Sequence, residues 1–457
     1  MAEKLLSVGL DVGTTTTQMV LSQLTIQNKG SAFSVPEMEI ASREILYKSP
    51  VYFTPLLGKD LVDGEKIRSI VEQEYSAAGI HRRQVSTGAI IITGETSRKE
   101  NARAVLDNLS EFAGDFVVAT AGPHLESILA AKGAGADIFS EETGQNVLHM
   151  DIGGGTANLA LIRKGEIVAT GCMNVGGRLV KIDANGMISY RSPVLDSLFP
   201  YEVGQIPPAA ALEQLCITLT QALEMAAGLR PATDLLAHLW TAEAGDPWPT
   251  PTDFPVLSFS GGVAECIEQT LPPFSFGDIG PVLGKAIRKS RLCENKYRLG
   301  NETIRATVIG AGCHSTQLSG STVFYRNISF PLKNLPVVSF TEKEQSSPDF
   351  GSCIRRKLEC QEDVSVLALP GYPAAHYDQI LFLAEVIGKL ELTGSVILVL
   401  QADMAKALGQ ALALRLPPQT PILCLDRLKL PPNSYLDVGA PVGSAIPVVI
   451  KTLILEK

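Results

Sequence analysis

Two segments of this chain repeat one pattern, in which an apolar run ends in an aspartate, a glycine-containing turn follows, and a second apolar run begins. The first segment lies at residues 5–24 and carries Asp11, and the second lies at residues 147–162 and carries Asp151. Two apolar runs joined by a glycine turn are typical of a β-hairpin. A hairpin repeated far along the chain predicts two halves built on one architecture.

The order of the remaining elements supports this duplication. The first half is predicted to run strand, strand, strand, helix, strand, helix, strand, over 5–11, 17–24, 39–47, 63–78, 88–93, 98–112 and 116–119. The second half begins in the same way, with strands and helices predicted over 147–151, 157–162, 167–173, 209–229, 255–259 and the residues after 262. After a polar segment at 341–349, which is predicted to be a linker, strands alternate with helices, as in a small parallel α/β unit. We therefore expect an α/β protein with domains at 1–120, 121–340 and 350–457.

The two glycine turns are candidates for phosphate binding. Consecutive backbone N–H groups and hydroxyls can converge in such turns, and glycine lets a ligand approach the backbone closely. Mg²⁺ commonly takes one or two carboxylates together with waters, so an aspartate before each turn suits a magnesium ion between them. Either turn alone is a common hairpin turn, whereas the pair predicts that two loops clamp one nucleotide. The candidate metal ligands and catalytic carboxylates are Asp11 and Asp151, and the candidate phosphate-binding residues are Gly13, Thr14, Thr15, Thr16, Gly153, Gly154, Gly155 and Thr156.

Two further glycine-containing segments have different predicted roles. A strand at 257–260 runs into Gly261 and Gly262, where two glycines would let a flat base or a ribose lie against the backbone. The segment 307–313 is rich in small residues and is predicted to form a tight helix crossing rather than a ligand contact.

Composition excludes several function classes. The net charge of −9 over 457 residues, without a stripe of Lys and Arg, argues against nucleic-acid binding. The sequence has no apolar run of the roughly 18 to 20 residues that a membrane span needs. The eight cysteines are scattered without a CxxC pair and the six histidines are dispersed, so neither a disulfide framework nor a zinc site of the usual spacing is predicted. A cytoplasmic location is expected.

The glycine segments, in this order, resemble the superfamily of actin, the heat-shock chaperones and the sugar kinases. Residues 8–20 are similar to its first phosphate motif, 147–161 to its second, 257–267 to its adenosine motif, and 121–135 and 307–317 to its two connecting helices. The resemblance implies two ribonuclease-H-like domains around a nucleotide cleft that binds ATP or ADP with Mg²⁺. It also implies that Gly261, Gly262 and Glu265 lie on the adenosine side.

The whole chain resembles a narrower family, the ethanolamine ammonia-lyase reactivating factors. The resemblance is carried by 91–102, 276–284 and 401–409, and it includes the residues after 317. It implies a chaperone-like protein with slow ATP hydrolysis, whose partner is the lyase and whose action releases damaged cobalamin so that adenosylcobalamin can rebind. It further implies a location in a bacterial microcompartment together with the lyase. Homo-oligomer formation stays open.

Two alternatives belong to other functional classes. A small-molecule kinase would need a carboxylate beside the acceptor hydroxyl, for which Asp137, Asp183 and Asp278 are candidates only by residue type. A nucleotide-dependent filament or scaffold protein with a role in cell shape or division would usually carry a membrane-binding terminal helix, whereas residues 448–455 are predicted to form a strand. The added unit at 350–457 is expected either to contact the partner or to stabilise the body of the protein.

Overall fold

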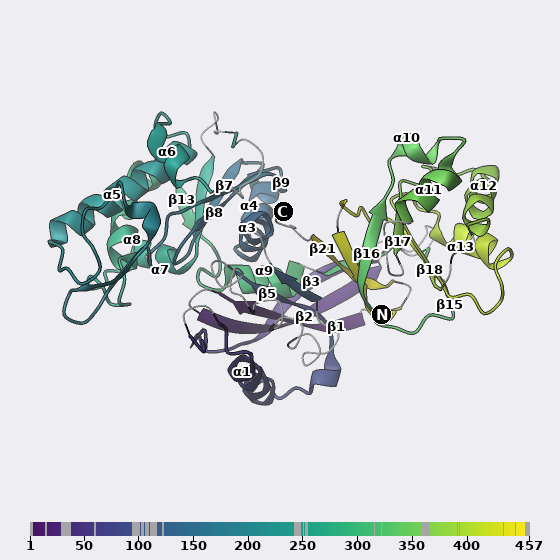
Figure 1. The fold of residues 1–457 in the computed structure, drawn as a ribbon, viewed down its shortest axis with the longest axis horizontal. Helices are drawn as coiled ribbons and strands as arrows, with labels where there is room; N and C mark the ends of the chain where they lie inside the picture. The colour runs from purple at the N-terminus through teal and green to yellow at the C-terminus, as the bar shows by residue number, and fades with distance from the viewer. Residues whose placement is uncertain are drawn as a thin grey trace.

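In the computed structural model the described residues are 3–452, apart from gaps at 14–15, 29–37, 59–60, 94–100, 102–104, 106–108, 110–116, 121–122, 242–247, 250, 252–254, 315, 321, 359–364, 391, 393, 433 and 444. The predicted helix at 98–112 lies mostly outside them. Figure 1 shows an N-terminal sheet placed between a second α/β body and a C-terminal unit. No helix within the described ranges is long and apolar enough to cross a membrane.

The N-terminal sheet is built around the first predicted hairpin. Its strands are β1 (Glu3–Val12), β2 (Thr16–Asn28), β3 (Met38–Lys48), β4 (Tyr52–Phe53), β5 (Val85–Ile92) and β6 (Val117–Thr120). The order is β3-β2-β1-β5-β6, with β1, β2 and β3 antiparallel and β5 and β6 parallel to β1. Helix α1 (Gly64–Ala77) begins at Asp63, whose side chain accepts a hydrogen bond from the amide of Lys66.

The second sheet has the same order. Its strands are β7 (Val147–Ile152), β8 (Ala157–Arg163), β9 (Glu166–Met173), β12 (Val256–Ser260) and β13 (Tyr297–Leu299), arranged as β9-β8-β7-β12-β13. The first three strands are again antiparallel, and β12 and β13 run parallel to β7. Two sheets with one order and one pattern of strand directions confirm the α/β fold class and the internal repeat. Both are ribonuclease-H-like sheets.

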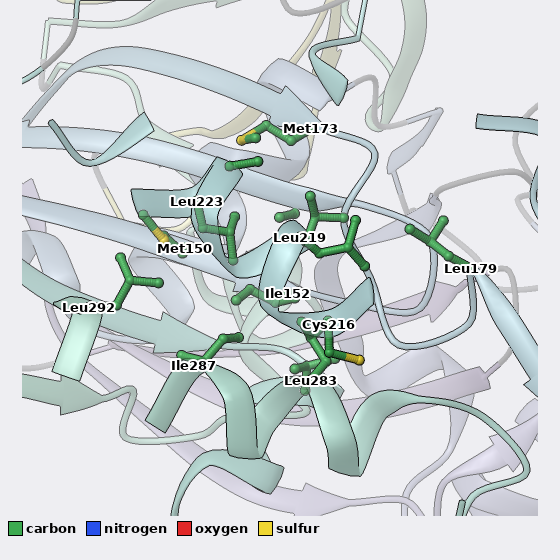
Figure 2. Packing of buried hydrophobic residues seen from close by; sticks show 14 of the residues in the cluster. Met150, Ile152, Met173, Leu179, Cys216, Leu219, Leu223, Leu283, Ile287 and Leu292 are labelled. Carbon is green, nitrogen blue, oxygen red and sulfur yellow. The ribbon is translucent and has the colours of Figure 1, made fainter. Parts of the chain in front are cut away.

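Helices cover the second sheet and make the largest core. They are α5 (Ala209–Ala226), α6 (Asp234–Leu239), α7 (Gly262–Glu268) and α8 (Gly280–Arg288), and a small ribbon of β10 (Val180–Ile182) and β11 (Ile188–Arg191) lies beside them. Leu212, Leu215, Leu219 and Leu223 recur at helical spacing on α5, so one face of this helix is buried. Figure 2 shows this face against Leu283 of α8 and the side chains of β7.

Two helices connect the halves. Helix α3 (Pro123–Gly133) packs on the second sheet, α9 (Ala306–His314) packs on β1 and β2, and the two helices cross each other. A Cβ atom on Gly310 would lie 2.0 Å from the carbonyl oxygen of Leu129, and one on Gly9 would lie 2.3 Å from that of Val308. The backbones therefore touch, and the predicted tight helix crossing at 307–313 is confirmed. Helix α4 (Ala136–Thr143) follows α3.

The C-terminal unit contains an eight-stranded sheet of order β14-β21-β20-β16-β17-β18-β19-β15. Its strands are β14 (Thr316–Leu318), β15 (Phe324–Arg326), β16 (Leu332–Ser339), β17 (Val366–Leu369), β18 (Val396–Leu400), β19 (Ile422–Leu425), β20 (Ser434–Val438) and β21 (Pro447–Thr452), and β16 to β19 are parallel. Its helices are α10 (Glu342–Gln345), α11 (Phe350–Leu358), α12 (Tyr377–Gly388) and α13 (Ala405–Ala413).

The start of this unit differs from the expectation. The strands β14 to β16 precede residue 340, yet they belong to the sheet of the C-terminal unit rather than to that of the second half. The segment 341–349 is not a linker, because Thr341 and Glu344 form a capping box that begins α10. Sheet membership therefore joins β14, β15 and β16 to the unit predicted at 350–457, while the predicted domain boundaries themselves stay predictions.

Candidate functional site

The first predicted phosphate loop closes directly after β1. The backbone N–H of Gly13 donates to the carbonyl oxygen of Thr16 at 2.9 Å, which forms the turn into β2. The hydroxyl of Thr54 donates to the carbonyl oxygen of Gly13 at 2.8 Å and so holds the loop from the β4 side. Thr14 and Thr15 lie outside the described residues, so their predicted phosphate contacts stay predictions.

Asp11 lies at the end of β1 and faces the second half of the molecule. The hydroxyl of Thr93, which follows β5, donates to Asp11 Oδ1 at 2.9 Å. Burial raises the pKa of Asp11 to about 7, against the opposing effect of Thr93, and the negative charge of Asp151 raises it further. The two predicted carboxylates are therefore close enough to repel each other, although they come from different sheets.

The second loop repeats the geometry of the first. The backbone N–H of Gly153 donates to the carbonyl oxygen of Thr156 at 2.9 Å, as Gly13 does in the first loop. Residues Gly153 to Thr156 are partly exposed, and a Cβ atom on Gly155 would find no other atom within 4 Å. Open space next to this backbone is what a bound phosphate needs.

Asp151 ends β7 and is 6% exposed. The hydroxyl of Ser260 donates to its Oδ1, and the hydroxyl of Thr307 on α9 lies 3.5 Å from its Oδ2. Burial raises the pKa of Asp151 to about 6, while these two hydroxyls act in the opposite direction. Thr307 thus links the connecting helix to the second loop.

A buried chain of hydrogen bonds behind Asp151 was missed by the sequence analysis. His149 is fully buried, with Nδ1 3.1 Å from the hydroxyl of Ser258 and Nε2 2.9 Å from that of Ser260. Ser260 gives its single proton to Asp151, so its oxygen must accept from His149 Nε2–H, and Nδ1 must accept from Ser258. The parallel register pairs His149 with Ser258 and Asp151 with Ser260, so all four side chains lie on one face of the sheet.

The predicted adenosine segment follows β12. Gly261 has φ of 90°, and a Cβ atom there would lie 2.3 Å from the carbonyl oxygen of Ile152, so no larger residue fits. Gly262 is exposed, with no other atom within 4 Å of a Cβ position. Glu265 accepts a hydrogen bond from the hydroxyl of Thr303. The loop is therefore built against the second phosphate loop, with open space at Gly262.

These residues fit a magnesium nucleotide. Two facing carboxylates with raised pKa values repel each other, and a divalent cation between them would relieve that repulsion. Within the described ranges, no group of three or more His, Cys, Asp or Glu side chains could hold a metal ion. A site for Mg²⁺ nevertheless needs only one or two carboxylates from the protein, because phosphates and waters supply the other ligands.

The candidate carboxylates of the kinase alternative make local structural contacts, and the first of them, Asp137, accepts at Oδ1 from the backbone amide of Ile138 at 2.9 Å. Asp183 Oδ1 accepts from the backbone amides of Asn185 and Met187, at 2.8 and 2.9 Å, and thus stabilises a turn. Asp278 forms an ion pair with Arg178, with Nε to Oδ2 at 3.1 Å. Arg178 was missed by the sequence analysis, because its ion-pair partner lies far along the chain.

Comparisons with known proteins show one family. The family model of the ethanolamine utilisation protein EutA matches residues 3–456. The chain is 38% identical to the ethanolamine ammonia-lyase reactivase EutA of Salmonella typhimurium, and the aligned region covers 98% of each chain. It is also 38% identical to the EutA reactivase of Escherichia coli, again over 98% of each chain.

Solved structures show more distant similarity. A Ppx/GppA family member from Aquifex aeolicus is 11% identical with a TM-score of 0.42, and the match covers 67% of this chain and 97% of that one. The ethanolamine utilization protein EutJ from Carboxydothermus hydrogenoformans is 18% identical with a TM-score of 0.34, over 67% and 88%. The family match over residues 3–456 and the two full-length relatives show that this chain belongs to the EutA family of ethanolamine utilisation proteins.

Proposed function

We propose that this protein binds one Mg·ATP between its two glycine loops and uses it to reactivate ethanolamine ammonia-lyase. The observation that carries the nucleotide part is the matched pair of loops. In each loop a glycine N–H closes the turn onto a threonine carbonyl, at 2.9 Å in both, and each strand before the loop presents an aspartate. The reactivase part rests on two relatives that carry this name and match 98% of the chain.

Different residues of the site would bind the phosphates, the adenosine and the metal ion. The N–H of Gly153 closes the turn, so the backbone N–H groups of Gly154, Gly155 and Thr156, together with those of the first loop, would donate to phosphate oxygens, and the open space at Gly262 would receive the adenosine. Asp11 and Asp151 would hold the metal ion. Mg²⁺ would neutralise phosphate charge and support slow hydrolysis of ATP. Glu265 is proposed to lie on the ribose side, where Thr303 orients its carboxylate.

The connecting helices would transmit the exchange of ADP for ATP from the nucleotide site to the relative position of the two halves. Helix α9 touches both halves, because its Thr307 lies against Asp151 while its Gly312 packs on Gly9 of β1. ATP and ADP would favour different closures of the two halves, and each closure would bind the lyase differently. A decisive shift between two states takes on the order of 5 kcal/mol of differential binding, which several phosphate and metal contacts can supply.

The partner would be ethanolamine ammonia-lyase with a damaged cobalamin. We propose that binding of this protein opens the lyase, releases the damaged cofactor and lets adenosylcobalamin enter. The C-terminal unit is the proposed contact surface, since it carries the exposed large side chains Tyr377, Phe382 and Leu414. The protein would act in the cytoplasm, inside or next to the microcompartment that holds the lyase.

The test uses lyase inactivated with bound cyanocobalamin. The purified protein and free adenosylcobalamin are added with or without Mg·ATP, and the release of ammonia and acetaldehyde is followed. We expect recovery only with ATP, and recovery is expected to fail with the Asp11→Asn variant as a matched control. Equal recovery without ATP would contradict the nucleotide role. Absence of recovery in a protein that binds ATP would contradict the reactivase role and leave the nucleotide site standing.

A further inference from the structure

Arg178 lies against the second phosphate loop. Its backbone N–H donates to the carbonyl oxygen of Gly154 at 2.6 Å, and the N–H of Gly177 donates to that of Gly153 at 3.1 Å. A Cβ atom on Gly154 would lie between 3.3 and 3.5 Å from three carbons of the Arg178 side chain. The arginine is thus attached to this loop by its backbone and covers it with its side-chain stem.

The guanidinium of Arg178 is held by Asp278. Nε donates to Asp278 Oδ2 at 3.1 Å, and the other oxygen, Oδ1, accepts from the backbone N–H of Gly280 at 2.9 Å. The side chain of Asp278 is 8% exposed, and that of Arg178 is 23% exposed. Among the described residues, no partner is seen for the two terminal nitrogens of Arg178. These two nitrogens can therefore bind an anion, whether or not Nε stays hydrogen-bonded to Asp278.

Asp278 belongs to the segment 276–284, which the sequence analysis singled out without giving it a role. This segment runs along the residues next to Arg178, since Ile279 N–H donates to the carbonyl oxygen of Gly177 and Ile182 N–H to that of Gly277, both at 2.9 Å. It then continues into α8. The segment consequently fixes the position of a carboxylate beside the phosphate loop.

The charges of the site favour an arginine at this position. Asp11 and Asp151 already repel each other, and a triphosphate brings further negative charge than one Mg²⁺ can balance. A guanidinium is suited to phosphate, because its planar fork donates two parallel hydrogen bonds to two oxygens. Such charge-assisted bonds are about twice as strong as bonds between neutral groups.

We propose that Arg178 is a phosphate-binding residue of the nucleotide site and that Asp278 competes with the phosphates for its guanidinium. The guanidinium turns from Asp278 towards the terminal phosphates when ATP enters, while Asp278 keeps the amide of Gly280. The proposal rests on the proposed nucleotide site, but it does not depend on the lyase.

The experiment compares Arg178→Gln, Arg178→Lys and Asp278→Asn with the wild type in calorimetric titrations with Mg·ATP, Mg·ADP and adenosine. Arg178→Gln is expected to weaken ATP binding by roughly tenfold to a hundredfold, ADP binding by less, and adenosine binding not at all. Arg178→Lys should give an intermediate loss, since it keeps the charge and loses the fork. Asp278→Asn should bind ATP at least as tightly as the wild type, because it no longer competes for the guanidinium.

The expected changes in ATP affinity distinguish phosphate binding from a structural role, because Arg178→Gln should lose affinity and Asp278→Asn should not. An ion pair that only stabilises the fold would make Asp278→Asn lose ATP affinity together with Arg178→Gln, and this result would overturn the proposal. So would wild-type ATP affinity in Arg178→Gln. Thermal unfolding of each variant identifies any that fail to fold, and the lysine variant then carries the comparison. A wild type that binds no Mg·ATP would overturn the nucleotide site as well, whereas failed lyase recovery alone would leave the inference intact.

Discussion

The Asp151→Asn variant is expected to stabilise the nucleotide-free protein while it removes the metal ligand. Asp151 is almost fully buried, and its pKa is raised from 3.8 to about 6, chiefly by burial. A raised pKa means that the folded state binds the proton more tightly than the unfolded state does, so ionisation of Asp151 destabilises the fold. A shift of about 2 pKa units corresponds to about 3 kcal/mol at a pH above both values.

The sign sets the pH dependence of the effect. The penalty is absent below the unfolded value of 3.8, grows as pH rises, and is complete above about 6. Asparagine can still accept a hydrogen bond from the hydroxyl of Ser260, and it carries no charge. The variant should therefore have a free energy of unfolding about 1 to 3 kcal/mol higher than the wild type at pH 8. It should also lower the pKa of Asp11, which the charge of Asp151 helps to raise.

The assay is calorimetric unfolding of the wild type and Asp151→Asn without nucleotide or Mg²⁺, at pH 8 and pH 4.5. The variant should unfold several degrees higher at pH 8, and the difference should shrink at pH 4.5, where the wild-type carboxyl is mostly protonated. Addition of Mg·ATP should then raise the unfolding temperature of the wild type by more than that of the variant, because the variant binds Mg·ATP more weakly. A variant that unfolds below the wild type at pH 8 would refute the reasoning.

Three further predictions follow from particular contacts. Ser260→Ala breaks the hydrogen-bond chain to Asp151, so the Mg²⁺ concentration needed for ATP binding should rise while the affinity for metal-free nucleotide stays unchanged. An unchanged Mg²⁺ requirement would contradict this role of Ser260. Gly310→Val places a side chain where a Cβ atom would meet a carbonyl oxygen at 2.0 Å, so it should lower the free energy of unfolding by about 3 kcal/mol or more in urea titrations. The control Gly58→Ala, where no other atom lies within 4 Å of the Cβ position, should leave the stability unchanged. Leu219→Ala in the fully buried core of Figure 2 should cost about 2 to 5 kcal/mol by the same titrations, and a loss below 1 kcal/mol would show that the core refills the cavity.

The parts of the fold that could be predicted from the sequence are those with strong local patterns. Each glycine hairpin joins adjacent strands, so its turn and its alternating apolar residues lie within a short window of sequence. The tight crossing of α9 was also readable, because a run of small residues leaves room for another backbone. The similarity of the two halves then followed from repetition, without any knowledge of distant contacts.

The rest depended on contacts between distant segments. Strands β14 and β15 are three residues each, and they join the C-terminal sheet only by pairing with β21 and β19 near the end of the chain. The chain of His149, Ser258 and Ser260 depends on the parallel register of β7 and β12, which no local pattern reveals. The start of α10 was readable in principle, since Thr341 followed by Glu344 is a capping-box pattern.

The central claim is that two loops from two sheets bind a single nucleotide with one metal ion. It is tested most directly by calorimetric titration of Mg·ATP into the wild type, Asp11→Asn and Asp151→Asn. The account predicts one site per chain in the wild type, and affinity reduced by roughly tenfold or more in each variant, since either change removes a charged metal ligand. Two sites per chain, or wild-type affinity in either variant, would contradict it.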